Sequence, residues 1–368
     1  MNIRPCYAEV NLNILEQNYY NIKKATPKII IPVVKANAYG HGLIEVAKRL
    51  IKCGAKMLAV ATVEEAIELR SNFAEVEILV LGHVLNVQIE TCINNNIKFP
   101  ISSLDAASYV SSLAEKLKKD VFIHFAVDTG MGRIGYLCHE ENDSVIDTIL
   151  SINKLPYLKL DGIFTHFASA DEINLDFTKK QHIIFKNIVS KLKDNGFNPN
   201  YIHCQNSAAT FVVDDDFSNA VRVGISLYGY KPSEFVDTPN ILPCLSWVCE
   251  ITHVKKVPKD TPIGYGSTYR TTRDSIIATI PVGYADGFRR SLSNKGFVLY
   301  NNTMVPVVGN VCMDQTMIDV TDIKECSVGD KIYLISSDNT AEVMAKQLNT
   351  ISYEVLCDIS SRVPRLYI

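Results

Sequence analysis

Short apolar segments alternate with amphipathic segments over the first two-thirds of the chain. Eight apolar segments have the length of a buried strand, and they cover residues 29–34, 57–60, 77–81, 97–99, 121–127, 158–163, 201–204 and 221–223. Segments with the helical spacing of apolar residues lie between them, over residues 43–52, 63–71, 104–117, 145–153 and 178–193. Eight strands, each followed by a helix, predict an α/β fold of the (β/α)8 TIM-like barrel type. A doubly wound sheet is the alternative, because the pattern alone does not show that the sheet closes.

The sequence changes character after about residue 231. Pro232, Pro239 and Pro243 mark a linker or domain entry. Strand-like runs follow over residues 247–257, 276–282, 297–299, 304–308, 317–320, 331–335 and 363–368, separated by turns rich in Gly, Asp and Asn, with one helix over residues 341–348. We therefore predict two domains, a barrel over residues 1–235 and a C-terminal mainly β domain over residues 236–368.

Composition and charge exclude several classes of partner. The 368 residues include 47% hydrophobic and 21% charged residues, and the formal net charge is −3. A weakly acidic chain favours neither nucleic acid nor an anionic membrane as a partner. No apolar run approaches the roughly 20 residues that span a bilayer, and the first residues lack the layout of a signal peptide. We expect a cytoplasmic enzyme.

The ten cysteines are scattered singly, without a CxxC pair. Such cysteines are mostly small buried hydrophobes in a reducing compartment. Cys138 with His139, and His203 with Cys204, resemble metal ligands only in isolation, because no second cluster accompanies either pair. We expect no metal site.

Polar residues follow several of the predicted barrel strands, and a barrel places its reactive groups at those strand ends. Lys35 ends the first strand, Arg133 follows the fifth, His166 the sixth, Ser207 the seventh and Arg222 lies on the eighth. A lysine at a strand end is either a solvated cap or a desolvated amine that serves as nucleophile or base. The neighbouring residues alone leave both interpretations open.

The segments that follow the seventh and eighth predicted strands have the pattern of a phosphate site. Asn206 and Ser207 open a helix, and Gly224 follows the eighth strand, where barrels commonly bind phosphate. Each segment also fits an ordinary structural feature: Asn206 and Ser207 fit a helix N-cap, and Gly224 fits a turn. A lysine together with a phosphate cradle predicts pyridoxal 5'-phosphate held as a Schiff base. Arg222 would suit the pyridine nitrogen, since an arginine donates a hydrogen bond without protonating its partner.

Tyr265 lies between glycines in the C-terminal part of the chain. It is either an exposed aromatic in a β-turn or a tyrosine that donates and accepts protons, with a pKa lowered by nearby cations.

Nine motifs in order resemble those of the alanine racemase family. They are VVKANAYGHG, DTGMGRIG, THFASAD, HCQNSAA, VRVGISLYGY, GYGSTY, PVGYADG, GNVCMDQ and RVPR, and they extend over nearly the whole chain. The resemblance implies a pyridoxal-phosphate barrel with a β domain, assembled as a head-to-tail homodimer with shared active sites. It also implies the interconversion of L-alanine and D-alanine, which supplies D-alanine for peptidoglycan. A broader-specificity amino-acid racemase of the same fold is the alternative.

The resemblance assigns roles to individual residues. Lys35 would carry the cofactor and act as one base, and the partner subunit's Tyr265 would be the base on the opposite face. Arg222 would face the pyridine nitrogen, with His166 bonded to it and to Tyr265. The other cofactor contacts implied are Tyr39, Asn206, Ser207, Gly224, Ile225 and Tyr353. Arg133 and the backbone of the partner subunit's Met313 would bind the substrate carboxylate.

The sequence departs from the family pattern at Ala126. Most relatives have a lysine there, usually carbamylated, whose negative charge steadies the arginine of the DTGMGR motif. We expect a chloride or another anion beside Arg133 instead, with His124 as a possible neighbour, because an unpaired buried charge is unfavourable. Water or a shifted side chain is the alternative.

Two other functions would share the lysine and the phosphate site. A non-catalytic pyridoxal-phosphate carrier needs no base on the opposite face, and an amino-acid decarboxylase gains nothing from two opposed bases. Tyr265 therefore favours a racemase over both.

Overall fold

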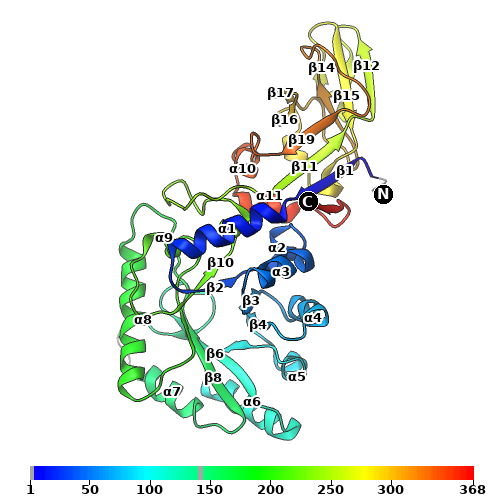
Figure 1. Cartoon of the computed structure of the whole chain (residues 1–368). Helices are drawn as coiled ribbons and strands as arrows, with labels where there is room; N and C mark the ends of the chain where they lie inside the picture. Colours follow the sequence, from blue (N-terminus) through cyan, green and yellow to red (C-terminus); the bar gives the residue numbers. More distant parts are fainter. Residues whose placement is uncertain (1–3, 140–143) are drawn as a thin grey trace. The chain divides into compact units, whose positions relative to one another are not determined.

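The computed structural model describes residues 4–139 and 144–368 (Figure 1). Contacts between Cα atoms divide the chain into two compact units. The barrel unit comprises Glu16–Ala38 and Leu43–Ile241, and the β unit comprises Met1–Leu15, Tyr39–Gly42 and Leu242–Ile368. The N-terminal segment thus belongs to the same unit as the C-terminal third, and the boundary between residues 235 and 236 stays a prediction.

Eight parallel strands close into a barrel in the barrel unit. They are β2 (Ile29–Pro32), β3 (Met57–Val60), β4 (Glu77–Val80), β5 (Phe99–Ile101), β6 (Val121–Asp128), β8 (Leu158–Phe164), β9 (Tyr201–His203) and β10 (Ala220–Val223). Hydrogen-bonded neighbours run in the order β2-β10-β9-β8-β6-β5, and β3 pairs with β4. Single bridges between Val33 and Ala59 and between Leu79 and Lys98 complete the ring. The predicted barrel is confirmed, and an open doubly wound sheet is excluded.

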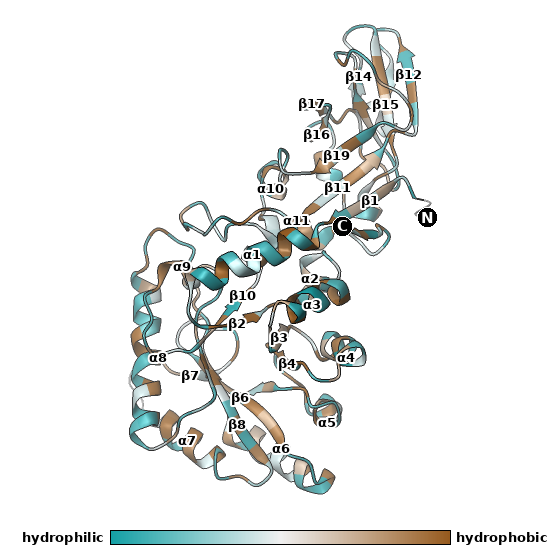
Figure 2. Cartoon of the chain, in the orientation of Figure 1, coloured by the Kyte–Doolittle hydropathy of each residue, from teal (hydrophilic) through white to brown (hydrophobic). Residues whose placement is uncertain are grey.

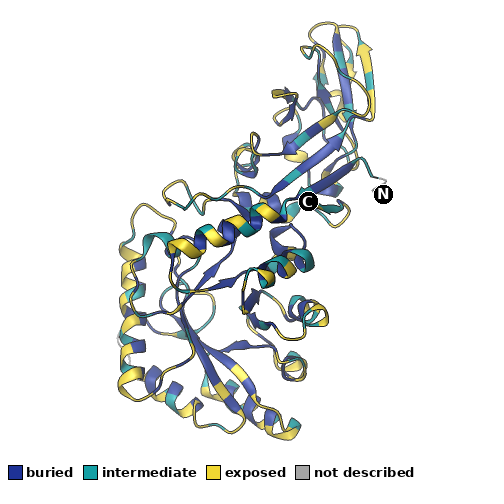
Figure 3. Cartoon of the chain, in the orientation of Figure 1, coloured by how far each residue is buried: buried dark blue, intermediate teal, exposed yellow. Residues whose placement is uncertain are grey.

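Helices follow the strands and cover the outside of the barrel (Figure 1). The α-helices of the chain up to this point are α1 (Leu12–Ala25), α2 (Lys35–Tyr39), α3 (Leu43–Lys52), α4 (Val63–Asn72), α5 (Asn86–Asn94), α6 (Leu104–Leu117), α7 (Ser144–Ile152), α8 (Asp176–Asp194) and α9 (Ala209–Val212). A short strand β7 (Tyr136–Leu137) pairs with β6, and a 3-10 turn η1 (Ile225–Tyr228) follows β10. Strands such as β3 are buried at every residue, and the helices expose one polar face (Figures 2 and 3).

The β unit is built on a six-stranded sheet in the order β17-β16-β19-β11-β1-β20. Its strands are β1 (Cys6–Val10), β11 (Leu245–Glu250), β16 (Phe297–Tyr300), β17 (Thr303–Pro306), β19 (Lys331–Ile335) and β20 (Arg365–Tyr367). A second sheet contains β12 (His253–Val257), β15 (Ser275–Ile280) and β18 (Thr316–Asp319), and β13 (Pro262–Ile263) pairs with β14 (Tyr269–Arg270). The remaining elements are α10 (Ala341–Leu348), α11 (Ser352–Asp358) and the 3-10 turns η2 (Tyr265–Ser267), η3 (Tyr284–Asp286) and η4 (Arg290–Leu292). The mainly β domain is confirmed.

Two features of the β unit differ from the expectation. The run over residues 247–257 forms two strands, because the chain leaves the first sheet after Glu250 and enters the second at His253. Strand β1 lies between β11 and the edge strand β20, and the sequence pattern did not reveal it.

Within residues 4–139 and 144–368, no helix is long and apolar enough to cross a membrane. The same residues contain no group of three or more His, Cys, Asp or Glu side chains placed to hold a metal ion. All ten cysteines are free thiols, and most of them are buried.

Candidate active site

Lys35 begins a left-handed turn of the backbone. Ala36, Asn37, Ala38 and Tyr39 all have φ between 52° and 54°. A left-handed conformation costs roughly 1–2 kcal/mol for each residue with a Cβ. Strain of this kind persists only where the surroundings over-determine the conformation, and it is concentrated at functional sites.

Several hydrogen bonds hold the turn in place. Glu65 accepts a hydrogen bond from the backbone N–H of Ala36 through its Oε1 at 2.6 Å. The Oδ1 of Asn37 accepts the N–H of Leu43 at 2.8 Å, and the N–H of Ala38 donates to the carbonyl of Val34 at 2.9 Å. The backbone at Lys35 is therefore fixed before any ligand binds. Glu65 also belongs to the capping box of α4, and this capping pattern is the only feature of the sequence that points to Glu65.

Four of the predicted residues line one cavity of about 260 Å³ in the barrel unit. Lys35, Arg133, His166 and Arg222 provide its polar groups, although they come from four different strand ends. Its apolar walls are Ala61, Leu81, Val127, Met131, Ile134 and Phe164. Four of the five strand ends therefore converge on this cavity, whereas Ser207, after the seventh strand, does not line it.

Arg222 is held by a dense set of acceptors. Its guanidinium donates to Nδ1 of His203 at 2.7 Å, to Nδ1 of His166 at 3.1 Å and to the carbonyl of Thr165 at 2.8 Å. It also donates to the carbonyls of His203 and Cys204. Burial lowers the pKa of Arg222 to about 10, so the group keeps its charge near neutral pH. The cavity thus contains a rigid, permanent donor.

The contact between Arg222 and His166 fixes the proton on His166. Burial and the positive charges of Arg222, Arg133 and Lys35 lower the pKa of His166, so the ring is neutral at pH 7. Because Arg222 can only donate, Nδ1 of His166 accepts and its proton lies on Nε2. His166 can therefore donate from Nε2.

The two candidate phosphate segments lie in contact. Ser207 is only 6% exposed, and its Oγ accepts the backbone N–H of Gly224 at 2.8 Å. Asn206 has the ordinary role of capping a helix start, since its Oδ1 accepts the N–H of Ala209. In the β unit, the rings of Tyr39 and Tyr353 lie 6.1 Å apart. The loops after the seventh and eighth barrel strands thus meet as the phosphate prediction requires.

A second hollow, in the β unit, contains two other predicted residues, Tyr265 and Met313. It measures about 580 Å³ and is lined by Tyr265, Tyr284, Arg290, Asn310, Val311, Cys312, Met313, Asp314 and Gln315. Tyr265 is 75% exposed and Met313 is 53% exposed. Nδ2 of Asn310 donates to the backbone carbonyl of Tyr265 at 2.7 Å and so holds its turn. Tyr265 and Met313 therefore share one open surface.

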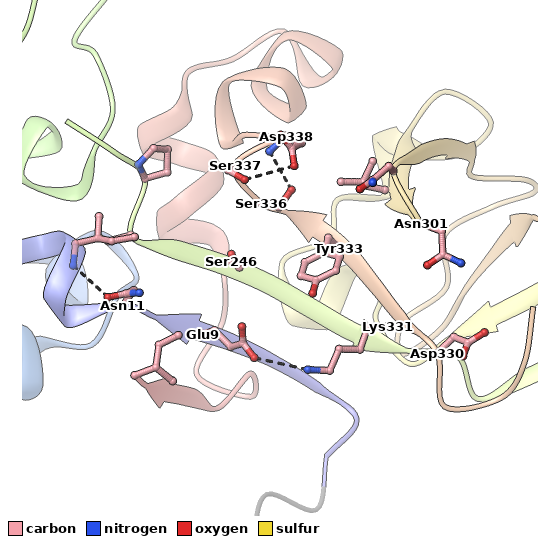
Figure 4. Close-up of a pocket in the computed structure, with 16 residues that line it drawn as sticks. Glu9, Asn11, Ser246, Asn301, Asp330, Lys331, Tyr333, Ser336, Ser337 and Asp338 are labelled. Carbon is pink, nitrogen blue, oxygen red and sulfur yellow. Dashed lines mark hydrogen bonds and ion pairs between the residues drawn. The ribbon is translucent and has the colours of Figure 1, made fainter. Parts of the chain in front are cut away.

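Another hollow of about 760 Å³ in the β unit contains none of the predicted site residues (Figure 4). Its charged side chains already have partners: Lys331 lies 3.9 Å from Glu9, Asp330 accepts a hydrogen bond from Tyr300, and Asp338 accepts one from Ser337. It has neither a reactive lysine nor a phosphate cradle.

The surroundings of Arg133 differ from the expectation. Arg133 is exposed in this chain, so the unfavourable burial of an unpaired charge does not apply to it. His124 is also wrongly placed for an anion, because its ring nitrogens face His203 and the Asp161 carboxylate. Ala126 is buried, at 2% exposure. An anion beside Arg133 stays a prediction, without His124 as its neighbour.

Comparison with known proteins covers both units. A family model described as "Alanine racemase, N-terminal domain" matches residues 10–232, and one described as "Alanine racemase, C-terminal domain" matches residues 244–367. The chain belongs to the alanine racemase family.

Relatives in the alanine racemase family match over nearly their whole length. Alanine racemase of Clostridium novyi (strain NT) is 43% identical, over 100% of this chain and 96% of its own. The structure of alanine racemase from Clostridium difficile 630 has a TM-score of 0.96 at 40% identity, over 100% of this chain and 97% of its own. Alanine racemase from Bartonella henselae, at 28% identity and a TM-score of 0.89, covers 99% of both chains and holds covalently bound pyridoxal phosphate.

Proposed function

We propose that this chain interconverts L-alanine and D-alanine, with pyridoxal phosphate attached to Lys35. Membership of the alanine racemase family supports the reaction. The observation that carries the site assignment is the convergence of Lys35, His166 and Arg222 on one cavity, from strand ends far apart in the sequence. Supply of D-alanine for peptidoglycan is part of this proposal.

The residues present fit pyridoxal phosphate. Lys35 supplies the amine, and Arg222 supplies a donor that does not release its proton to a pyridine nitrogen. Ser207 supplies a hydroxyl, and Ile225 begins the turn that follows Gly224, so the Ser207 hydroxyl and the backbone N–H of Ile225 would meet the phosphate, with Gly224 beside them. Tyr39 and Tyr353 would add their hydroxyls. When bound, the cofactor withdraws electrons from the Cα–H bond of the amino acid and so acidifies it.

Racemisation requires a base on each face of the substrate. Lys35 would exchange the proton on one face. The partner subunit's Tyr265 would do so on the other, with its phenolic oxygen accepting the Nε2–H of His166. Arg133 and the backbone of the partner subunit's Met313 would hold the carboxylate, so that Cα lies between the two bases.

A homodimer with shared sites is supported by the exposure of the second hollow. Tyr265 and Met313 are open to solvent in the single chain, although an acid-base group needs a site that excludes water. A second copy of the chain would supply that site. The oligomeric state is measured by light scattering after size-exclusion chromatography.

An anion such as chloride would balance Arg133 where Ala126 replaces the usual lysine. Anomalous density and turnover in bromide, chloride and halide-free buffers test this. Density near Arg133 with halide-dependent turnover is expected, and the absence of both would dismiss the anion.

Incubation of the purified holoenzyme with single L-amino acids, followed by chiral chromatography, tests the function. We expect D-alanine to form far faster than D-serine or D-lysine. Equal rates would instead support the broader-specificity racemase, and no D-product from any amino acid would refute the proposal.

A further inference from the structure

A row of polar side chains continues from Arg222 into the barrel core. His203 accepts from Arg222 through Nδ1 at 2.7 Å, and its Nε2 lies 2.8 Å from Nδ1 of His124. Nε2 of His124 then lies 3.7 Å from Oδ2 of Asp161. All four side chains are at most 5% exposed. The packing of apolar side chains in a barrel interior does not require such a row of polar side chains.

Donor chemistry fixes the direction of every bond in this row. Arg222 only donates, so Nδ1 of His203 accepts and the His203 proton lies on Nε2. That N–H donates to Nδ1 of His124, which places the His124 proton on Nε2 as well. The Nε2 atom of His124 is buried and has no hydrogen-bond partner among the residues that the structure describes, and the carboxylate of Asp161 is the acceptor that it faces.

We propose that His203 and His124 form a one-way hydrogen-bond chain that ends against the Asp161 carboxylate, 3.7 Å from Nε2 of His124, and holds Arg222 in place, and that His124 and Asp161 are therefore positioning residues for the racemase reaction. The link from Arg222 to His203 is one contact of the site already described. The new element is the extension through His124 to a carboxylate at the far end.

The backbone is shaped to build this chain. Between β6 and β8 the register shifts, so that Ile123 pairs with Leu160 and His124 pairs with Gly162. Asp161 is the extra residue of this bulge, and a bulge re-aims a side chain that regular pleating would direct elsewhere. A Cβ on Gly162 would lie 2.5 Å from Nδ1 of His124, so the imidazole lies in space that only glycine leaves.

Asp161 is itself anchored at its far side. Lys98 donates to its Oδ2 at 2.5 Å, and Asn200 donates to its Oδ1 at 2.8 Å. Lys98 also pairs with Glu77 at 3.0 Å. With Arg222 and Lys98 positive and Asp161 and Glu77 negative, the whole row is neutral in charge.

This hydrogen-bond chain brings a negative charge to bear on Arg222, which the direct contacts of Arg222 lack. The groups that accept from its guanidinium are uncharged carbonyls and imidazoles. A carboxylate that faces the N–H of one imidazole makes the other nitrogen of that ring a stronger acceptor, and aligned dipoles reinforce one another. Asp161 thus strengthens the hold of His203 on Arg222 from two rings away.

The groups that face the two imidazoles keep them uncharged. His203 is faced by Arg222, His124 and the ring of Phe164, and burial with the Arg222 charge lowers its pKa. His124 is faced by Asp161, Lys98, Glu77 and the ring of Tyr201, and burial lowers its pKa despite Asp161. A proton added to His203 would place two donors against each other at 2.7 Å.

The first test is made on the wild-type holoenzyme without substrate. The side-chain 15N shifts of ¹⁵N-histidine-labelled protein report which nitrogen carries the proton. We expect His203 and His124 both to be neutral Nε2–H tautomers, unchanged between about pH 6 and pH 9. An Nδ1–H tautomer or an imidazolium at either residue would overturn the proposal. The proposal rests on the proposed function only for its effect on turnover, so this result stands even if the substrate assignment fails.

The second test uses Asp161→Asn, which retains the size of the side chain and leaves Lys98 paired with Glu77. We expect both histidine signals to shift and kcat to fall about 10- to 100-fold with a smaller change in KM, as for other supporting contacts of a catalytic group. His182→Gln is the matched control, since His182 lies 3.5 Å from the buried Asp215 without a bond to Arg222. That variant should leave kcat and the His203 and His124 signals unchanged. Unmoved signals, or an unmoved kcat, in Asp161→Asn would overturn the proposal.

Discussion

Replacing Lys98 by Met should destabilise the protein strongly, because it leaves a buried carboxylate without its cation. The Lys98 side chain is 9% exposed and the Asp161 side chain 4%, with Nζ and Oδ2 2.5 Å apart. Removal of one partner from a buried ion pair costs about 3–5 kcal/mol. Glu77 adds little to this figure, since its side chain is 39% exposed.

The penalty should depend on pH in a defined direction. Burial alone would raise the pKa of Asp161, but the N–H of His124 that faces it, hydrogen bonds from Lys98 and Asn200, and the charge of Lys98 hold it below its ordinary value. The wild-type carboxylate therefore stabilises the fold above about pH 4, and this contribution is lost as the pH falls further. In Lys98→Met, burial dominates and the folded pKa rises above the unfolded value. The loss should be full near pH 8 and should shrink toward pH 4, and about 3–5 kcal/mol corresponds to roughly 2–4 pKa units.

Urea unfolding of the holoenzyme, followed by circular dichroism at fixed protein and cofactor concentrations, measures this loss. The double variant Lys98→Met with Asp161→Asn should recover most of the stability, because no buried charge is left unpaired. Lys186→Met is the control, since its pair with Asp216 is exposed and should contribute nothing measurable. A loss below about 1 kcal/mol at pH 8, or one equally large at pH 4.5, would refute the reasoning.

Three further predictions concern the proposed site. Lys35→Ala should lose the absorbance of the covalently bound cofactor and all turnover, and an active, cofactor-free variant would contradict its role. Tyr265→Ala should reduce turnover in both directions by at least about 100-fold while the cofactor spectrum persists, because one proton exchange is lost; unchanged rates would exclude it as a base. Ser207→Ala should weaken cofactor binding about tenfold, measured by fluorescence titration of the apoprotein, since one donor to the phosphate is removed; unaltered affinity would exclude the phosphate role.

Local sequence patterns predicted the barrel well, because its strands and helices each show a short-range periodicity of apolar residues. The helices over residues 43–52 and 104–117 have the predicted bounds, as does the strand over residues 57–60. Each of these segments has its own apolar pattern and its own turn signals. Closure of the sheet needed the structure, since it depends on bridges such as that between Leu79 and Lys98.

Elements that depend on partners distant along the chain could not be predicted from the sequence. Strand β1 is defined by its pairing with β11 and β20, which lie more than two hundred residues away along the chain. The left-handed turn after Lys35, over residues 36–39, contains no glycine, so no local residue type predicts its positive φ angles. The bulge at Asp161 depends on how β8 pairs with β6. The sequence assigned no role to His203, although His203 accepts a hydrogen bond from Arg222.

The central claim, that Lys35 of one subunit works with Tyr265 of the other, is tested most directly by hybrid dimers. Lys35→Ala and Tyr265→Ala subunits, each inactive alone, are unfolded together, refolded with cofactor and assayed for D-alanine. Random pairing puts half of the subunits in hybrids, and each hybrid has one site with both bases, so about a quarter of wild-type activity should return. A mixture that stays as inactive as its two components would show that the two residues do not act across the dimer, and would contradict the account.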